Sequence, residues 1–249
     1  MKILFISLGC DKNLADSEEM LGLLTGNGHE IVDSEEEADA IVINTCCFIH
    51  DAKEESVNTI LEMAEYKKTG PCKILIVTGC MAQRYKEEIT EEIPEVDAVL
   101  GTTSYGDIVK ALNEAEAGHV FREFKDINAL PEDSGRRVIT TGGHFGYLKI
   151  AEGCDKHCTY CIIPSLRGKF RSVPEERLLK QAEYMASQGV RELILVAQET
   201  TVYGTDLYGK KTLHLLLKKL CQIRGIRWIR VLYCYPEEIY DELIQVMKE

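Results

Sequence analysis

Apolar residues occur along this chain in short runs that alternate with amphipathic segments. In the first half, compact apolar runs predict buried strands at residues 2–8, 38–45, 73–79 and 96–101. Residues 16–28 predict a helix that Asp16 or Ser17 can cap. Further helices are expected at residues 51–66, in a segment ending near Ile93, and at residues 107–117. Strands alternating with helices indicate an α/β fold with a parallel sheet covered on both faces.

The second half repeats this alternation after a break. Strands are expected at residues 145–153, 192–198 and 227–235, and helices at residues 174–189, 212–220 and 236–249. Three strand–helix units are too few for a closed barrel, so we expect a partial (β/α) barrel and a chain that is a fragment of a longer protein. Residues 119–143 break the rhythm with Pro131 and Gly142-Gly143 and indicate a linker. The predicted organisation is therefore an N-terminal domain 1–118, a linker 119–143 and the first part of a barrel at 144–249.

Composition narrows the class of protein. At 45% hydrophobic and 28% charged, the 249 residues can bury a core, and the net charge of −12 comes without a basic block. A general nucleic-acid surface is not supported, whereas an acidic surface suits a basic protein partner. No apolar run is long enough for a membrane span, and the N-terminal run is too short for a signal peptide. We expect a cytoplasmic monomer whose ten cysteines serve metal binding or catalysis more than disulfides.

The densest signal is Cys154, Cys158 and Cys161, spaced C-x3-C-x2-C after a predicted strand. Thiolates at this spacing can bind one iron–sulfur cube, and three cysteines leave its fourth iron open. One alternative is a zinc site with His157 as fourth ligand. A second alternative is a set of purely structural thiols.

A second triad is dispersed. Cys10, Cys46 and Cys80 each follow an apolar run, at intervals of 36 and 34 residues. Equivalent ends of parallel strands share one edge of a sheet, so these cysteines are expected to converge and to hold a second cluster. The alternative is three buried small hydrophobic residues. Cys47 competes with Cys46, which we prefer because it is the first residue beyond the strand.

The quoted motifs resemble one family. "SLGCDKNLADSE", "INTCCFIHDAKEES", "TGCMAQRY", "YLKIAEGCDKHCTYCIIPSLRGKFRS" and "LVAQETTVYG" look like the methylthiotransferases of the radical S-adenosylmethionine (SAM) superfamily. The resemblance covers essentially the whole chain. It implies an N-terminal domain with three dispersed cysteines, then a radical-SAM barrel. Family members continue through a full barrel to a TRAM domain, and both are expected to be missing here, which would reduce activity.

The resemblance also implies the substrate. One branch of the family modifies an adenosine of tRNA, and another an aspartate of the twelfth small-subunit ribosomal protein. Asp11-Lys12 and "AQETTVYGTDLYG" are similar to the second branch, because the tRNA branch typically has Gln-Met where Asp11-Lys12 stands. The tRNA reaction remains the alternative, and a non-catalytic iron–sulfur or electron-transfer module is a third possibility.

The implied chemistry uses two 4Fe–4S clusters and SAM. The Cys154/Cys158/Cys161 cluster, reduced by a flavodoxin or ferredoxin, would cleave SAM to a radical that removes hydrogen from the aspartate β-carbon, and the Cys10/Cys46/Cys80 cluster would supply sulfur. A second SAM would donate the methyl group. Tyr160, Arg167 and Gln198 are the candidate SAM contacts. Tyr160 could instead be a packing residue, and Arg167 a surface or salt-bridge residue.

Overall fold

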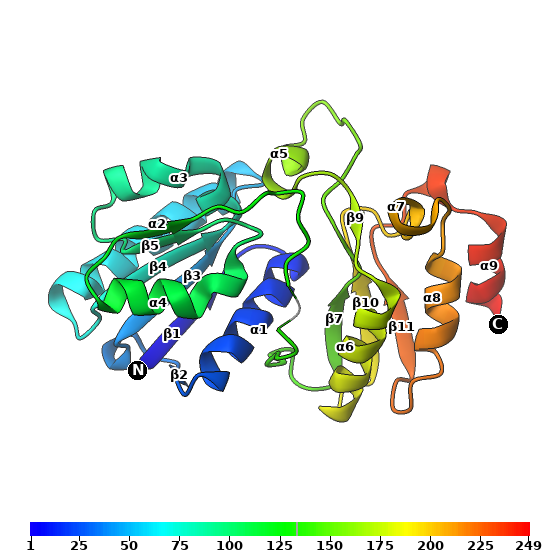
Figure 1. Cartoon of the computed structure of the whole chain (residues 1–249), viewed down its shortest axis with the longest axis horizontal. Coiled ribbons are helices and arrows are strands. Elements are labelled where there is room, and N and C mark those ends of the chain that lie inside the picture. The colour runs from blue at the N-terminus through cyan, green and yellow to red at the C-terminus, as the bar shows by residue number, and fades with distance from the viewer. Residues whose placement is uncertain (133) are drawn as a thin grey trace. The chain divides into compact units, whose positions relative to one another are not determined.

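A computed structural model describes residues 1–132 and 134–249 of the chain (Figure 1). Residue 133, inside the predicted linker, lies outside the described residues. By its contacts the chain divides into two compact units. The first unit comprises Met1–Val138 together with Cys158–Arg167, and the second comprises Ile139–His157 together with Gly168–Glu249.

The first unit contains a parallel sheet in the order β2-β1-β3-β4-β5-β6. Its strands are β1 (Lys2–Ser7), β2 (Glu30–Val32), β3 (Ala40–Thr45), β4 (Ile74–Gly79), β5 (Ala98–Leu100) and β6 (Phe121–Glu123). The predicted parallel α/β fold is confirmed. Sequence patterns missed the three-residue strands β2 and β6, and β6 lies inside the predicted linker, where it pairs with β5.

Helices cover both faces of this sheet (Figure 1). They are α1 (Asp11–Gly26), α2 (His50–Thr69), α3 (Cys80–Glu92) and α4 (Ile108–Glu116), with short 3₁₀ helices at Glu35–Glu37 and Tyr105–Asp107. Alternate residues of β3 enter opposite cores. Ile41 and Ile43 pack in the core that includes residues of α2 and α3, while Ala40 and Val42 pack in the core that includes residues of α1 and α4. Burial on both faces explains the continuous apolar runs of the sequence.

The second unit is built on three parallel strands in the order β11-β10-β7. These are β7 (Phe145–Lys149), β10 (Glu192–Val196) and β11 (Trp228–Val231), and a separate antiparallel pair joins β8 (Ala151–Glu152) to β9 (Arg171–Ser172). The helices are α6 (Glu175–Ser187), α7 (Thr205–Tyr208), α8 (Leu213–Leu220) and α9 (Asp241–Lys248), with a 3₁₀ helix, η3, at Pro236–Glu238. Helix α5 (Ile163–Arg167) belongs to the first unit.

Two predicted helices have different bounds in the structure. Helix α1 begins at Asp11, directly after Cys10, instead of near Asp16. The predicted helix 236–249 is interrupted, because Tyr240 is extended and its hydroxyl lies 3.0 Å from Nδ1 of His214. Among the described residues, no helix combines the length and the apolar character that crossing a membrane requires.

Candidate functional site

Cys10, Cys46 and Cys80 lie at one edge of the first unit's sheet. They follow β1, β3 and β4, which are neighbouring strands. The register pairs Ser7 with Asn44 and Thr45 with Gly79, so the three strands end at the same level. The convergence expected from the parallel-strand argument is therefore present in the backbone.

Two of these cysteines stand at helix N-termini. Cys10 is the N-cap residue of α1, and Cys80 is the first residue of α3. The unpaired N–H groups and the dipole at a helix N-terminus favour negative charge. Cys10 and Cys80 therefore lie where a negatively charged group bound at the sheet edge would be favoured.

Cys46 is fixed through its backbone. Its N–H donates to the hydroxyl of Ser56 at 3.0 Å, and the same hydroxyl donates to the Cys46 carbonyl at 2.8 Å. Gly9 passes close to it with φ of +90°, and a Cβ on Gly9 would stand 2.7 Å from Cβ of Cys46. A glycine beside Cys10 is thus needed for both its backbone angle and its close approach.

Cys47 has a different environment. It is 1% exposed, packs in the core on the α2/α3 face, and its Sγ donates to the Cys80 carbonyl at 3.3 Å. Burial raises the pKa of Cys47 to about 12. This thiol is engaged inside the protein, whereas Cys46 stands at the sheet edge.

The three edge thiols influence one another electrostatically. Burial is the main reason that the pKa values of Cys46 and Cys80 are raised, and the nearby charge of Cys10 raises both further. The guanidinium of Arg167 acts in the opposite direction on both thiols. Burial therefore disfavours the thiolate forms of these cysteines. A metal that replaced the thiol protons would stabilise the thiolates.

The cysteines of C-x3-C-x2-C lie in the loop between β8 and α5. Cys154 belongs to the second unit, where its N–H donates to the Gly168 carbonyl at 3.1 Å. Cys158 and Cys161 are grouped with the first unit, and the Cys161 N–H donates to the Cys158 carbonyl at 3.1 Å.

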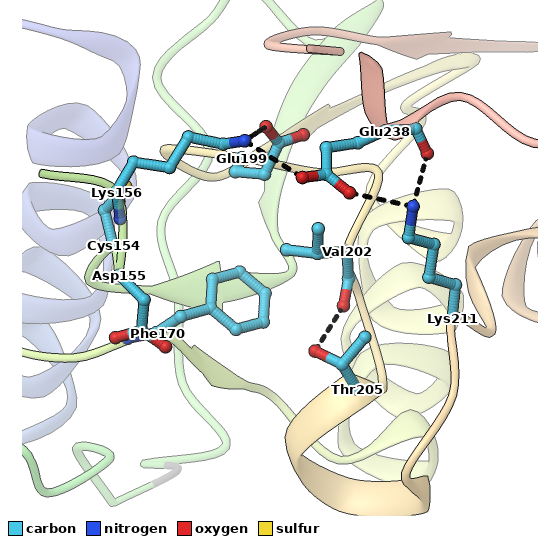
Figure 2. A pocket seen from close by; sticks show the side chains of 9 residues that line it. All are labelled: Cys154, Asp155, Lys156, Phe170, Glu199, Val202, Thr205, Lys211 and Glu238. Carbon is cyan, nitrogen blue, oxygen red and sulfur yellow. Dashed lines mark hydrogen bonds and ion pairs between the residues drawn. The ribbon is translucent and has the colours of Figure 1, made fainter. Parts of the chain in front are cut away.

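The second unit has a pocket of about 340 Å³ beside Cys154 (Figure 2). Glu238 is held there by Nζ of Lys156 at 3.1 Å and Nζ of Lys211 at 2.8 Å. Glu199 is 2% exposed, its Oε1 accepts from the Thr201 N–H at 3.1 Å, and its Oε2 is 3.8 Å from Nζ of Lys156. Within the described part of the chain, that Oε2 accepts no hydrogen bond.

The three predicted SAM contacts lie in different environments. Tyr160 is 85% exposed. Arg167 is buried in the first unit, against Asn13 and Asp16. Gln198 follows β10, and its buried Oε1 has no hydrogen-bond partner among the described residues. Their role in binding SAM stays a prediction.

Comparison with known proteins places these features in a family. Residues 2–101 match the model described as Uncharacterized protein family UPF0004, and residues 148–249 match the Radical SAM superfamily. The chain is 66% identical over 248 residues to "Ribosomal protein uS12 methylthiotransferase RimO" of Lachnoclostridium phytofermentans, covering 100% of this chain and 56% of that protein. It is 52% identical to the protein of that name from Clostridioides difficile, again covering 100% and 56%.

The chain therefore carries a UPF0004 domain followed by a radical-SAM domain, and over its whole length it is similar to the RimO branch of the radical-SAM methylthiotransferases. It spans about half the length of the curated relatives it matches. Clusters of the 4Fe–4S type and SAM are the cofactors of this family.

Two solved structures are similar to this chain in fold, and their low sequence identity carries no further conclusion. The radical SAM methyltransferase TsrM from Kitasatospora setae, with cobalamin and a [4Fe-4S] cluster bound, matches with a TM-score of 0.61 at 11% identity, covering 99% of this chain and 58% of that one. The cobalamin-dependent radical SAM enzyme OxsB matches with a TM-score of 0.53 at 16% identity, covering 99% and 41%.

The two cysteine triads are ligands of the type that the cofactors of this family require. Among the described residues, no three His, Cys, Asp or Glu side chains are grouped closely enough to hold a single metal ion. In an iron–sulfur cube each thiolate binds a different iron, so its ligands need not meet at one point. Three thiols at a sheet edge, two of them at helix N-termini, fit such a cluster.

Three polar residues near these sites were missed by sequence reasoning. Asn13 and Ser56 contact the cysteine loops of the first unit, and Glu199 lines the pocket of the second. The position of Glu199 next to Gln198, just beyond a strand, could have identified it. Nothing in the sequence pattern distinguishes Ser56 from an ordinary helix residue.

Proposed function

We propose that this chain carries the cofactor-binding part of a radical-SAM methylthiotransferase that modifies the β-carbon of an aspartate in ribosomal protein uS12. The main support is the placement of Cys10, Cys46 and Cys80 at the ends of three adjacent strands, in a chain 66% identical to a protein named for that activity. Two 4Fe–4S clusters, one per cysteine triad, are part of the proposal. When bound, the clusters and SAM supply the radical, the sulfur and the methyl group.

The residues of the chain have distinct proposed tasks. Ser56 and Gly9 set the position of Cys46, and Cys10 and Cys80 stand at the N-termini of α1 and α3, where a negatively charged cluster is favoured. In the second unit, the buried Oε2 of Glu199 has an ion partner in Nζ of Lys156 at 3.8 Å but accepts no hydrogen bond among the described residues, so it can still accept one from a bound molecule. The amino group of SAM can donate this hydrogen bond, and Gln198 offers a second acceptor in the preceding position.

The proposal also includes the electron donor, the oligomeric state and the cellular compartment. A flavodoxin- or ferredoxin-type protein would supply the electron, and the enzyme would act as a monomer in the cytoplasm. A basic ribosomal protein suits a chain with a net charge of −12 better than tRNA does.

A paired substrate assay tests the proposal. The protein, extended to the length of its curated relatives, is reconstituted anaerobically and incubated with SAM, reductant and either uS12 or tRNA. Mass spectrometry is expected to find the methylthio group on one aspartate of uS12 and none on tRNA. Modified tRNA with unmodified uS12 would replace the proposal by the tRNA reaction. If neither substrate were modified, a non-catalytic module would be favoured.

A further inference from the structure

The side chain of Arg167 lies beside the dispersed cysteine triad of the first unit. It is 3% exposed. Nη1 donates to Oδ2 of Asp16 at 2.8 Å, and Nη2 donates to Oδ1 of Asn13 at 2.5 Å. Its charge lowers the pKa of the Cys80 thiol, against the larger effect of burial. Arg167 ends helix α5, six residues after Cys161, so the segment that carries Cys158 and Cys161 also supplies this cation to the first unit.

Asn13 connects Arg167 to all three cysteine loops. Its Nδ2 donates to the Leu8 carbonyl at 3.1 Å and to the Thr45 carbonyl at 2.9 Å, just before Cys10 and Cys46. Its Oδ1 accepts from Arg167 and lies 3.8 Å from Sγ of Cys80. Asn13 is completely buried. Since each side of the amide has fixed partners, its orientation is determined by the loops that it joins.

We propose that Arg167, held by Asn13 and Asp16, is a positioning residue that stabilises negative charge on the cluster bound by Cys10, Cys46 and Cys80. The inference rests on the proposed function, because it requires a cluster at that triad. A guanidinium stays protonated at every accessible pH, and burial strengthens its field. An electron added to a thiolate-bound cluster increases its negative charge, so Arg167 favours the reduced form and raises the reduction potential. Asp16 offsets part of this effect while it orients the guanidinium.

The test uses the protein at the length of its relatives, with Cys154, Cys158 and Cys161 replaced by Ala so that one cluster remains. The midpoint potential of that cluster is measured by a redox titration followed by electron paramagnetic resonance. R167Q is expected to shift the potential to a more negative value, and R167K to restore most of the shift. D16N is expected to shift the potential in the opposite direction, because it removes the compensating negative charge. The matched control is R122Q, which changes an exposed arginine of β6 in the same unit.

Each outcome decides between the hypotheses. Potentials of R167Q and D16N equal to that of R122Q would overturn the inference while leaving the proposed function intact. A parent protein without iron would overturn the proposed function and the inference with it. If circular dichroism shows that R167Q does not fold, D16N alone tests the inference. A midpoint potential that does not rise in D16N would then contradict it.

Discussion

The hydroxyl of Ser56 bonds both backbone polar groups of Cys46, accepting from the N–H at 3.0 Å and donating to the carbonyl at 2.8 Å. Ser56 is completely buried on α2, so neither group of Cys46 has water as a substitute. S56A is expected to destabilise the protein by about 1–3 kcal/mol, the cost of leaving a buried backbone group unpaired. Urea unfolding measures this loss, and iron analysis should show lower occupancy of the dispersed triad.

The control for S56A is T59A on the same helix. The hydroxyl of Thr59 makes an exposed bond to the Glu55 carbonyl at 2.8 Å. T59A should change the free energy of unfolding by less than about 0.5 kcal/mol and leave the iron content unchanged. Equal effects of the two variants would contradict the proposed role of Ser56.

Gly9 and Gly28 separate backbone strain from steric contact. Both have positive φ, +90° and +84°, but a Cβ on Gly28 would meet nothing within 4 Å, whereas one on Gly9 would collide with Cys46. G28A should cost about 1–2 kcal/mol from backbone strain alone. G9A should cost more in urea unfolding and should lower the iron bound at the triad. A full iron complement in G9A would show that Cys46 need not stay in this position.

The thiols of the first unit should differ in reactivity before any metal is bound. With a pKa of about 12, Cys47 is almost wholly protonated near pH 8, and it is buried. Iodoacetamide should therefore label Cys47 only as fast as the protein unfolds, while the exposed Cys10 and Cys221 react in the folded state. Mass spectrometry of peptides follows each site, and rapid labelling of Cys47 would contradict its placement in the core. C47A should keep the full iron content.

Glu238 should contribute a pH-dependent stability to the second unit. Hydrogen bonds from Lys211 and then Lys156 lower the pKa of its carboxyl below the ordinary 4.5. Because the pKa is lower in the folded state, the contribution is complete above the unfolded pKa and is lost as the pH falls through the folded one. The melting temperature of the native chain should exceed that of E238Q near pH 7, and the gap should close in acid.

The control for E238Q is E65Q, which removes an exposed pair with Lys68 on α2. Exposed pairs are screened by water and contribute little. E65Q should therefore match the native melting temperature across the same pH range. A gap between native and E238Q that widens on acidification would refute the assigned direction of the pKa shift.

The edge placement of the dispersed cysteines could be predicted because parallel strands impose it. Apolar runs located β1, β3 and β4, and the residue just beyond each run had to lie near the same edge. The start of α1 could not be predicted from capping residues. Cys10 takes the N-cap position without a side-chain cap, and the first turn is held by the tertiary bonds of Asn13 to Leu8 and Thr45.

The contacts of Arg167 could not be predicted from local sequence patterns either. Its motif lies next to Cys161, which suggested a SAM contact, yet the side chain reaches Asn13 and Asp16 of the first unit. Such contacts depend on how distant segments pack, which periodicity does not encode. The strand β6 was missed for a similar reason, since three residues carry too little pattern and pairing with β5 decides their conformation.

The central claim is that each cysteine triad binds its own cluster, and counting iron and sulfide tests it most directly. The protein at the length of its relatives is reconstituted anaerobically, together with variants lacking Cys10, Cys46 and Cys80 or lacking Cys154, Cys158 and Cys161. We predict about eight iron and eight sulfide per native chain and about four of each in either variant. Zinc in place of iron, or an iron content that the loss of Cys10, Cys46 and Cys80 leaves unchanged, would contradict the account.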